Sequence, residues 1–112
     1  MNTTKIVQEI SVEEYTEILS RYKDKIVISP HALDHLSLAQ RNVFKYNELI
    51  STITKEKPRC VGLQKNGRYA VYFRRSEGFQ KIIFEAKPYE LEIITFMNTD
   101  TFPNLKRIQH DE

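Results

Sequence analysis

Apolar residues recur every three or four positions through the first half of the chain, which is the spacing of helices that bury one face. This pattern predicts three helices, over residues 12–22, 30–39 and 47–54. Two apolar runs are too short for a helix. They predict a strand or extended lead-in at residues 5–10 and a short strand at residues 25–28.

The predicted helices begin at residues suited to capping. Ser11 and Glu14 have the spacing of a capping box, in which the two side chains bond free backbone N–H groups of the first turn. Ser29 followed by Pro30 is a favoured start for the second helix, because proline lacks an N–H that would be unpaired there anyway. Asn47 is a candidate cap for the third helix.

Polar and apolar residues alternate through much of the second half, which is typical of strands with one buried face. The alternation predicts four consecutive strands, over residues 59–65, 68–75, 79–86 and 91–97. Asn66 and Gly67 are a strong signal for a tight hairpin between the first two strands. Residues 98–112 have no clear period and are interpreted as a tail or short arm.

Helices followed by a run of strands indicate the α+β class. We expect the helices to pack on one face of a four-stranded, or slightly larger, antiparallel sheet and to leave the other face open. The chain has 112 residues, of which 40% are hydrophobic. That length and core content predict a single domain over residues 1–112.

Basic residues concentrate in the middle of the chain. Residues 41–75 contain nine basic and two acidic residues, although the whole chain has a net charge of only +2. Such a segment favours a polyanionic partner, but it is also compatible with a solvated face whose bases pair with the acidic ends. For the first alternative, the candidate nucleic-acid-binding residues are Arg41, Lys45, Lys65, Arg74 and Arg75.

Strand alternation divides the side chains of residues 68–75 between two faces. One set is apolar and predicts core positions: Tyr69, Val71 and Phe73. The other set contains Arg68, Ala70, Tyr72 and Arg74. Arginine can bind phosphate through two hydrogen bonds and tyrosine can stack on a base, so the second set is a candidate RNA-binding face. An exposed sheet face without a ligand is the alternative.

Two histidines lie four residues apart in the predicted second helix. His31 and His35 therefore project from one helical face, a spacing that also occurs in zinc sites. Ala32 stands where such a site has its general-base glutamate, and no cluster of cysteine or histidine supplies more ligands. We therefore predict no metal and no cofactor. His31 is a candidate general acid or base, because free imidazole titrates near pH ~6.5; packing against the preceding strand is the alternative.

The single cysteine, Cys60, cannot form an internal disulfide, and its place in an apolar strand predicts a buried structural thiol. The sequence opens without a secretory leader pattern. No apolar run approaches the ~18 residues that a membrane span needs. We expect a cytoplasmic protein without a membrane partner.

Several short motifs resemble a known family. Residues 29–33 read Ser-Pro-His-Ala-Leu after a short strand, residues 66–69 read Asn-Gly-Arg-Tyr, and residues 93–96 read Ile-Ile-Thr-Phe. Over about residues 26–97 the chain resembles the family called domain of unknown function 4258. That family is similar to the RelE, ParE and BrnT toxin superfamily.

The resemblance implies a RelE-like fold and a toxin-like, RNA-directed activity. That activity is metal-independent endoribonuclease cleavage, in which the 2′-hydroxyl attacks the neighbouring phosphate with help from a base, an acid and cations. His31 matches the family's opening histidine, and Arg68 lies in the strand after the hairpin glycine. With Tyr72 they are the candidate catalytic residues. The implied partners are RNA, including ribosome-associated mRNA, and an antitoxin protein.

The chain also departs from the family. Members often carry arginine four residues after the histidine, where this chain has His35, so His35 is a candidate modifier of activity. Residues 37–46 resemble an insertion, in which Arg41 is a candidate replacement for that arginine. Two functions therefore stay open. One is a RelE-like ribonuclease with the three candidate catalytic residues, and the other is a non-catalytic module that binds nucleic acid or a protein.

Overall fold

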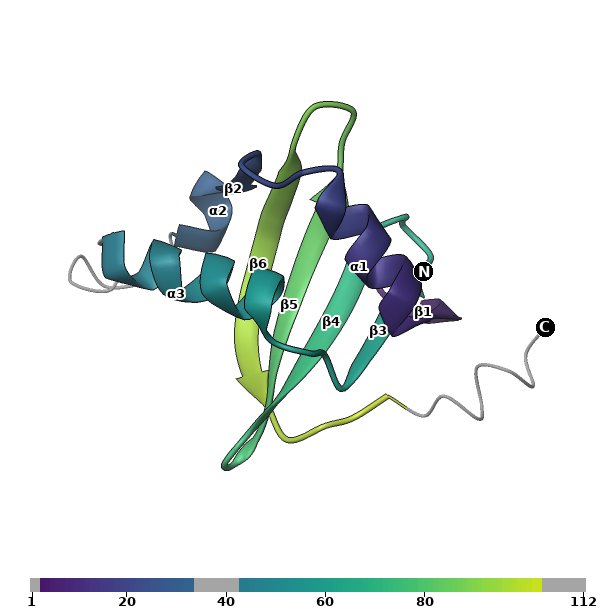
Figure 1. Ribbon diagram of the computed structural model, residues 1–112. Helices are drawn as coiled ribbons and strands as arrows, with labels where there is room; N and C mark the ends of the chain where they lie inside the picture. Colours follow the sequence, from purple (N-terminus) through teal and green to yellow (C-terminus); the bar gives the residue numbers. More distant parts are fainter. Residues whose placement is uncertain (1–2, 34–42, 104–112) are drawn as a thin grey trace.

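Helices and strands segregate into two layers (Figure 1). The computed structural model describes residues 3–33 and 43–103. The helices in these ranges are α1 (Val12–Ser20), α2 (Pro30–Leu33) and α3 (Val43–Lys55). The strands are β1 (Ile6–Ile10), β2 (Ile26–Ile28), β3 (Cys60–Gln64), β4 (Tyr69–Arg75), β5 (Gly78–Ala86) and β6 (Leu91–Thr99). Within the described part of the chain, no helix is long and apolar enough to cross a membrane.

The strands form one sheet in the order β1-β3-β4-β5-β6-β2. Its centre is the predicted meander, since β3 to β6 pair antiparallel with their neighbours in the sequence. At the edges, β1 pairs antiparallel with β3, and β2 pairs parallel with β6. The α+β class is therefore confirmed. The expected antiparallel sheet was too small, because the described sheet has six strands and one parallel pair.

The two additional strands come from the short apolar runs in the first half of the chain. Ile6 and Ile10 of β1 are buried at one edge of the sheet, and Ile26 of β2 is buried at the other. α1 carries the chain across one sheet face between these edges (Figure 1). A short apolar run indicates a strand but does not reveal its partner, which is why the sheet was underestimated.

Both predicted serine caps are confirmed. The Glu14 backbone N–H donates to Ser11 Oγ at 3.1 Å, and the Ala32 N–H donates to Ser29 Oγ at 3.1 Å. The Ser29 hydroxyl also donates to the Ile94 carbonyl at 3.1 Å. This second bond ties the start of α2 to β6.

The predicted start of the third helix was wrong. α3 begins at Val43, so Asn47 lies inside the helix and does not cap it. Tyr46 lies in the additional first turn, and its hydroxyl donates to the Ile26 carbonyl at 2.9 Å. This contact with β2 favours a longer helix than the local cap signal indicates, since tertiary context overrides local preference. Residues 34–39 of the predicted second helix lie outside the described residues.

The main hydrophobic core lies between the helices and one sheet face, here called the helix-covered face. Val71 and Phe73 of β4 are fully buried there and Tyr69 packs against them, as strand alternation predicted. The helices contribute four buried side chains to this core: Tyr15, Ile18, Leu49 and Ile53. The Tyr15 hydroxyl also donates to the Ile53 carbonyl at 2.9 Å, which joins α1 to α3.

Candidate nucleic-acid interface

The sheet face turned away from α1 and α3, here called the opposite face, carries a second and smaller apolar cluster. Its buried members are Ile6, Cys60, Ala70, Tyr72 and Ile83, with Phe79 and Ile94 packed against them. Ala70 and Tyr72 belong to the set that alternation placed away from the main core, so that division of β4 is confirmed. The face is not fully open, because Tyr72 is only 6% exposed.

Tyr72 lies in an aromatic cluster on the opposite face. Its ring centroid is 5.8 Å from that of Phe102 in an edge-on arrangement, and Phe102 lies 4.8 Å from Phe79. The Lys81 ammonium group is 5.6 Å from the Tyr72 ring centroid, within the range of cation–π attraction. Burial, and then the neighbouring Cys60, raise the pKa of the Tyr72 phenol.

A turn after β6 brings Phe102 to this cluster. Gly78 lies against the turn with φ of +99°, and a Cβ at this position would be 2.6 Å from the Thr99 carbonyl oxygen. The Thr101 N–H donates to Thr99 Oγ1 at 3.1 Å. The chain then runs past the ends of β5 and β4 (Figure 1). The sequence gives no signal for this contact, because residues 98–112 have no clear period and predict only a tail or short arm.

Two basic residues border the aromatic cluster. Arg74 is directly opposite Phe79 in the β4–β5 ladder, and Lys81 is directly opposite Tyr72. Cross-strand partners share a sheet face, so both cations lie on the opposite face with the rings. We call this set the basic aromatic surface: Tyr72, Arg74, Phe79, Lys81 and Phe102.

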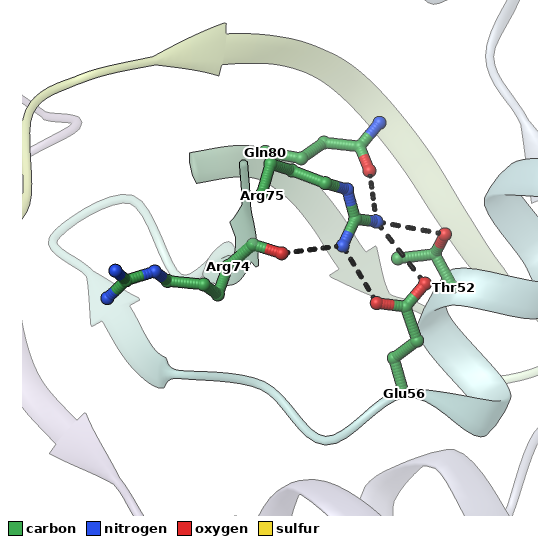
Figure 2. A network of polar contacts seen from close by, with 5 residues as sticks. All are labelled: Thr52, Glu56, Arg74, Arg75 and Gln80. Atoms are coloured by element: carbon green, nitrogen blue, oxygen red, sulfur yellow. Dashed lines mark hydrogen bonds and ion pairs between the residues drawn. The ribbon is translucent and has the colours of Figure 1, made fainter. Parts of the chain in front are cut away.

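Charge around the basic aromatic surface is mixed. Arg74 and Lys81 share this part of the sheet with Glu77 in the β4–β5 turn and Asp100 after β6. Figure 2 shows the Arg74 side chain projecting away from the neighbouring polar contacts of Arg75. The Arg74 guanidinium is therefore placed to meet an anion from solvent.

Arg75, although predicted to bind nucleic acid, forms a polar clamp on the other side of the strand (Figure 2). Its Nη1 lies 2.8 Å from Glu56 Oε1, and its Nη2 donates to Gln80 Oε1 at 2.8 Å and to Thr52 Oγ1 at 3.4 Å. Thr52 lies in the last turn of α3, and Glu56 directly follows the helix. The clamp therefore joins β4 and β5 to α3, and a polar pocket of about 440 Å³ adjoins it.

Arg68 and Lys65 lie at the far end of the sheet from Arg74. Arg68 Nε is 3.1 Å from Glu85 Oε1, so this predicted catalytic cation already has a carboxylate partner. Lys65 is exposed in the β3–β4 hairpin. Arg68 and Tyr72 are four residues apart along extended chain, which corresponds to about 13 Å. The structure therefore does not bring Arg68 to the phenol of Tyr72.

His31 is exposed in α2, which packs against β6. β5 separates β6 from β4, the strand of Tyr72. Adjacent strands are about 4.8 Å apart, so β4 lies about 10 Å from β6 and about 14 Å from β2. The three candidate catalytic residues are thus placed on separate parts of the sheet, and they do not form one compact site.

The remaining predicted site residues are not all described. Arg41 and His35 lie outside the described residues, as does the side chain of Lys45. Within residues 3–33 and 43–103, no three histidine, cysteine or acidic side chains are grouped to hold a metal ion. Cys60 is buried, as predicted, and burial raises the pKa of its thiol to about 11. That shift opposes thiolate chemistry at neutral pH.

A separate groove of about 720 Å³ lies on the helix side of the molecule. It is bordered by α1 and the end of α3, with Leu19 and Ile50 among its apolar lining residues. None of the predicted catalytic or nucleic-acid-binding residues lines it. None of the residues of the basic aromatic surface lines this groove either.

Comparison of the chain with protein-family models, curated proteins and solved structures finds no match. The RelE-like resemblance therefore stays a prediction.

Proposed function

We propose that this protein binds single-stranded RNA through the basic aromatic surface and does not cleave it. The observation that carries the proposal is the pair of aromatic rings of Tyr72 and Phe79 on adjacent strands, which Phe102 contacts and the cations of Arg74 and Lys81 border. Proteins that bind single strands combine aromatic rings, on which bases stack, with cations that follow the phosphates.

A single strand fits this surface better than a duplex. Bases in a duplex stack on each other, whereas bases of a single strand can leave the stack and meet an aromatic ring. Arg74 and Lys81 project from adjacent strands beside the rings, so a base on the cluster would place its phosphates near both cations. The proposed RelE-like relationship also implies RNA as the ligand.

Binding without cleavage follows from the separation of the candidate catalytic residues. Cleavage by the 2′-hydroxyl needs a base, an acid and a cation at one phosphate. His31 lies on α2, Arg68 is paired with Glu85, and burial raises the pKa of the Tyr72 phenol. The geometry therefore supports the binding module better than the ribonuclease.

Fluorescence anisotropy with a labelled single-stranded RNA of roughly 12 nucleotides tests the binding proposal. If Arg74 and Lys81 each contact a phosphate, they should contribute about 1.4 to the slope of log Kd against log salt concentration, at ~0.7 per phosphate. The double variant Arg74→Ala/Lys81→Ala should lower that slope by about 1.4.

The matched control removes two exposed lysines from the α1–β2 connection, in the variant Lys23→Ala/Lys25→Ala. It changes the net charge equally and should leave the slope nearly unchanged. Equal losses in both double variants would show non-specific attraction and would contradict the proposed surface. A folded wild-type protein with no RNA affinity at low salt would overturn the function.

The ribonuclease alternative has its own test. Incubation of the protein with the same RNA in EDTA should leave the RNA intact, because His31, Arg68 and Tyr72 are too far apart in the described structure to act on one phosphate. Cleavage that disappears in a His31→Ala variant would overturn the non-catalytic proposal and return His31 to a catalytic role.

A further inference from the structure

The segment that follows β6, residues 100–103, is here called the strap. Its hydrogen bonds in the described structure stay local: Thr101 N–H donates to Thr99 Oγ1 at 3.1 Å, and the Thr101 hydroxyl donates to Asp100 Oδ1 at 3.4 Å. The contacts described between the strap and the opposite face are those of the Phe102 ring. The strap therefore rests on the sheet mainly through one side chain.

Phe102 shields the ring on which a base would stack. Tyr72 is only 6% exposed, whereas Phe102 itself is 37% exposed at the surface of the cluster. Stacking requires a free ring face. A base cannot stack on the Tyr72 ring while Phe102 packs against it. The base and the Phe102 ring therefore compete for the same contact with Tyr72.

We propose that the strap is an internal competitor of RNA: Phe102 closes over Tyr72 in the free protein and leaves when a base stacks there. The inference rests on the proposed RNA-binding function and concerns regulation of the same site. The close approach of Gly78 to Thr99 and Asp100 fixes the point from which the strap departs. Within the described chain, the movement is then confined to Thr101, Phe102 and Pro103.

The expected size of the effect follows from the population of the open strap. The apparent Kd equals the intrinsic Kd divided by the fraction of open protein. Two ring contacts hold the strap, and base stacking on an aromatic residue is of comparable strength. Removal of the Phe102 ring should therefore lower the Kd for the labelled RNA by about fivefold.

Two truncations and one substitution distinguish the effect of the strap on RNA binding from the effect of the residues after it. Phe102→Ala and a chain ending after Thr99 should both bind RNA about fivefold more tightly than the full chain. A chain ending after Pro103 keeps the strap and is the control. The residues it removes contain two bases and two acids, so its net charge and its Kd should be unchanged.

A spectroscopic measurement follows the strap itself. In protein labelled with 4-fluorophenylalanine, loss of one ¹⁹F signal in a Phe102→Leu variant assigns Phe102. Addition of RNA should move that signal towards its position in the urea-unfolded chain, because the ring leaves Tyr72 and Phe79. Thermal unfolding monitored by circular dichroism verifies that each variant is folded.

The outcomes distinguish the strap from the binding function. If Phe102→Ala binds RNA more weakly, or the Phe102 signal does not move when RNA binds, then Phe102 is part of the stacking platform. The competitor role is then overturned while the proposed function stands. If no form of the folded protein binds RNA, the proposed function fails and the competitor role fails with it.

Discussion

The two faces of the sheet use the same strands for different purposes. On the helix-covered face, Phe73 and Phe84 are fully buried beneath α1 and α3. On the opposite face, Tyr72 and Phe79 are covered by one aromatic side chain of the strap and bordered by bases. Burial by helices is permanent in the folded state, whereas cover by a single side chain is easily removed.

This difference shows how one strand can serve both stability and recognition. Phe73 of β4 faces the main core, while its neighbours in sequence, Tyr72 and Arg74, face the other way. The helix-covered face should therefore account for most of the free energy of unfolding. Substitutions on the opposite face should change the free energy of unfolding little but should alter RNA binding.

The largest expected effect compares a phenylalanine from each face. Phe73→Ala removes a fully buried ring and should lower the free energy of unfolding by about 3–5 kcal/mol. Phe79→Ala removes a half-buried ring and should cost about 1–2 kcal/mol. Urea unfolding monitored by circular dichroism measures both. Equal losses would mean that the opposite face contributes as much to stability as the main core, and would contradict the difference between the two faces.

The Arg75 clamp gives the next effect. Arg75→Ala removes the bonds that join β4 and β5 to α3 and should lower the free energy of unfolding by about 2 kcal/mol. Both partners of the Arg75–Glu56 ion pair are partly exposed, so a double-mutant cycle should assign only about 0.5–1 kcal/mol to it. The control is Arg74→Ala on the opposite face, which should be nearly neutral. A loss for Arg74→Ala as large as that for Arg75→Ala would contradict the division of the two arginines.

The sequence predicts the residues of the helix-covered face more completely than those of the opposite face. Helical spacing and strand alternation located Phe73 and the helices above it, because burial on one face imposes a period. Alternation also separates Arg74 from Arg75, so the different faces of these two arginines could have been predicted. Their shared positive charge concealed that signal.

The parts of the site that could not be predicted depend on contacts distant in sequence. Phe102 lies in a stretch without a period, and only the turn against Gly78 brings it to Tyr72. The grouping of His31 and Arg68 was inferred from motif order, which carries no distances. In the structure, β5 lies between β4, which follows Arg68, and β6, against which the helix of His31 packs.

Cys60 provides a test of the opposite face at high pH. Burial raises the pKa of its thiol from 9.0 to about 11, so the folded protein holds this proton when the unfolded chain has lost it. The resulting stability is fully present below pH 9 and is lost as the pH rises towards 11. Between pH 8.5 and 11, wild type should lose about 1–2 kcal/mol more than Cys60→Ala, measured by urea unfolding. Parallel losses in the two proteins would show that the thiol is accessible to solvent in the folded state.

A substitution at Lys81 should also have a small effect on stability, and this effect contrasts most clearly with its effect on binding. Lys81 is half-buried, and its described contact is the cation–π interaction with Tyr72, which contributes about 0.5–1 kcal/mol. Lys81→Met keeps the apolar stem but removes the charge, so it should lower the free energy of unfolding by less than about 1 kcal/mol.

The same substitution should reduce the salt dependence of RNA binding by about 0.7 in slope, the share of one phosphate contact. Lys81→Arg keeps the charge and should restore that slope, which a purely structural role of Lys81 would not require. If Lys81→Met unfolds the protein as readily as Phe73→Ala while leaving the slope unchanged, Lys81 belongs to the core and not to a binding surface. The opposite face would then be a second core, and its bases would have to be explained without RNA.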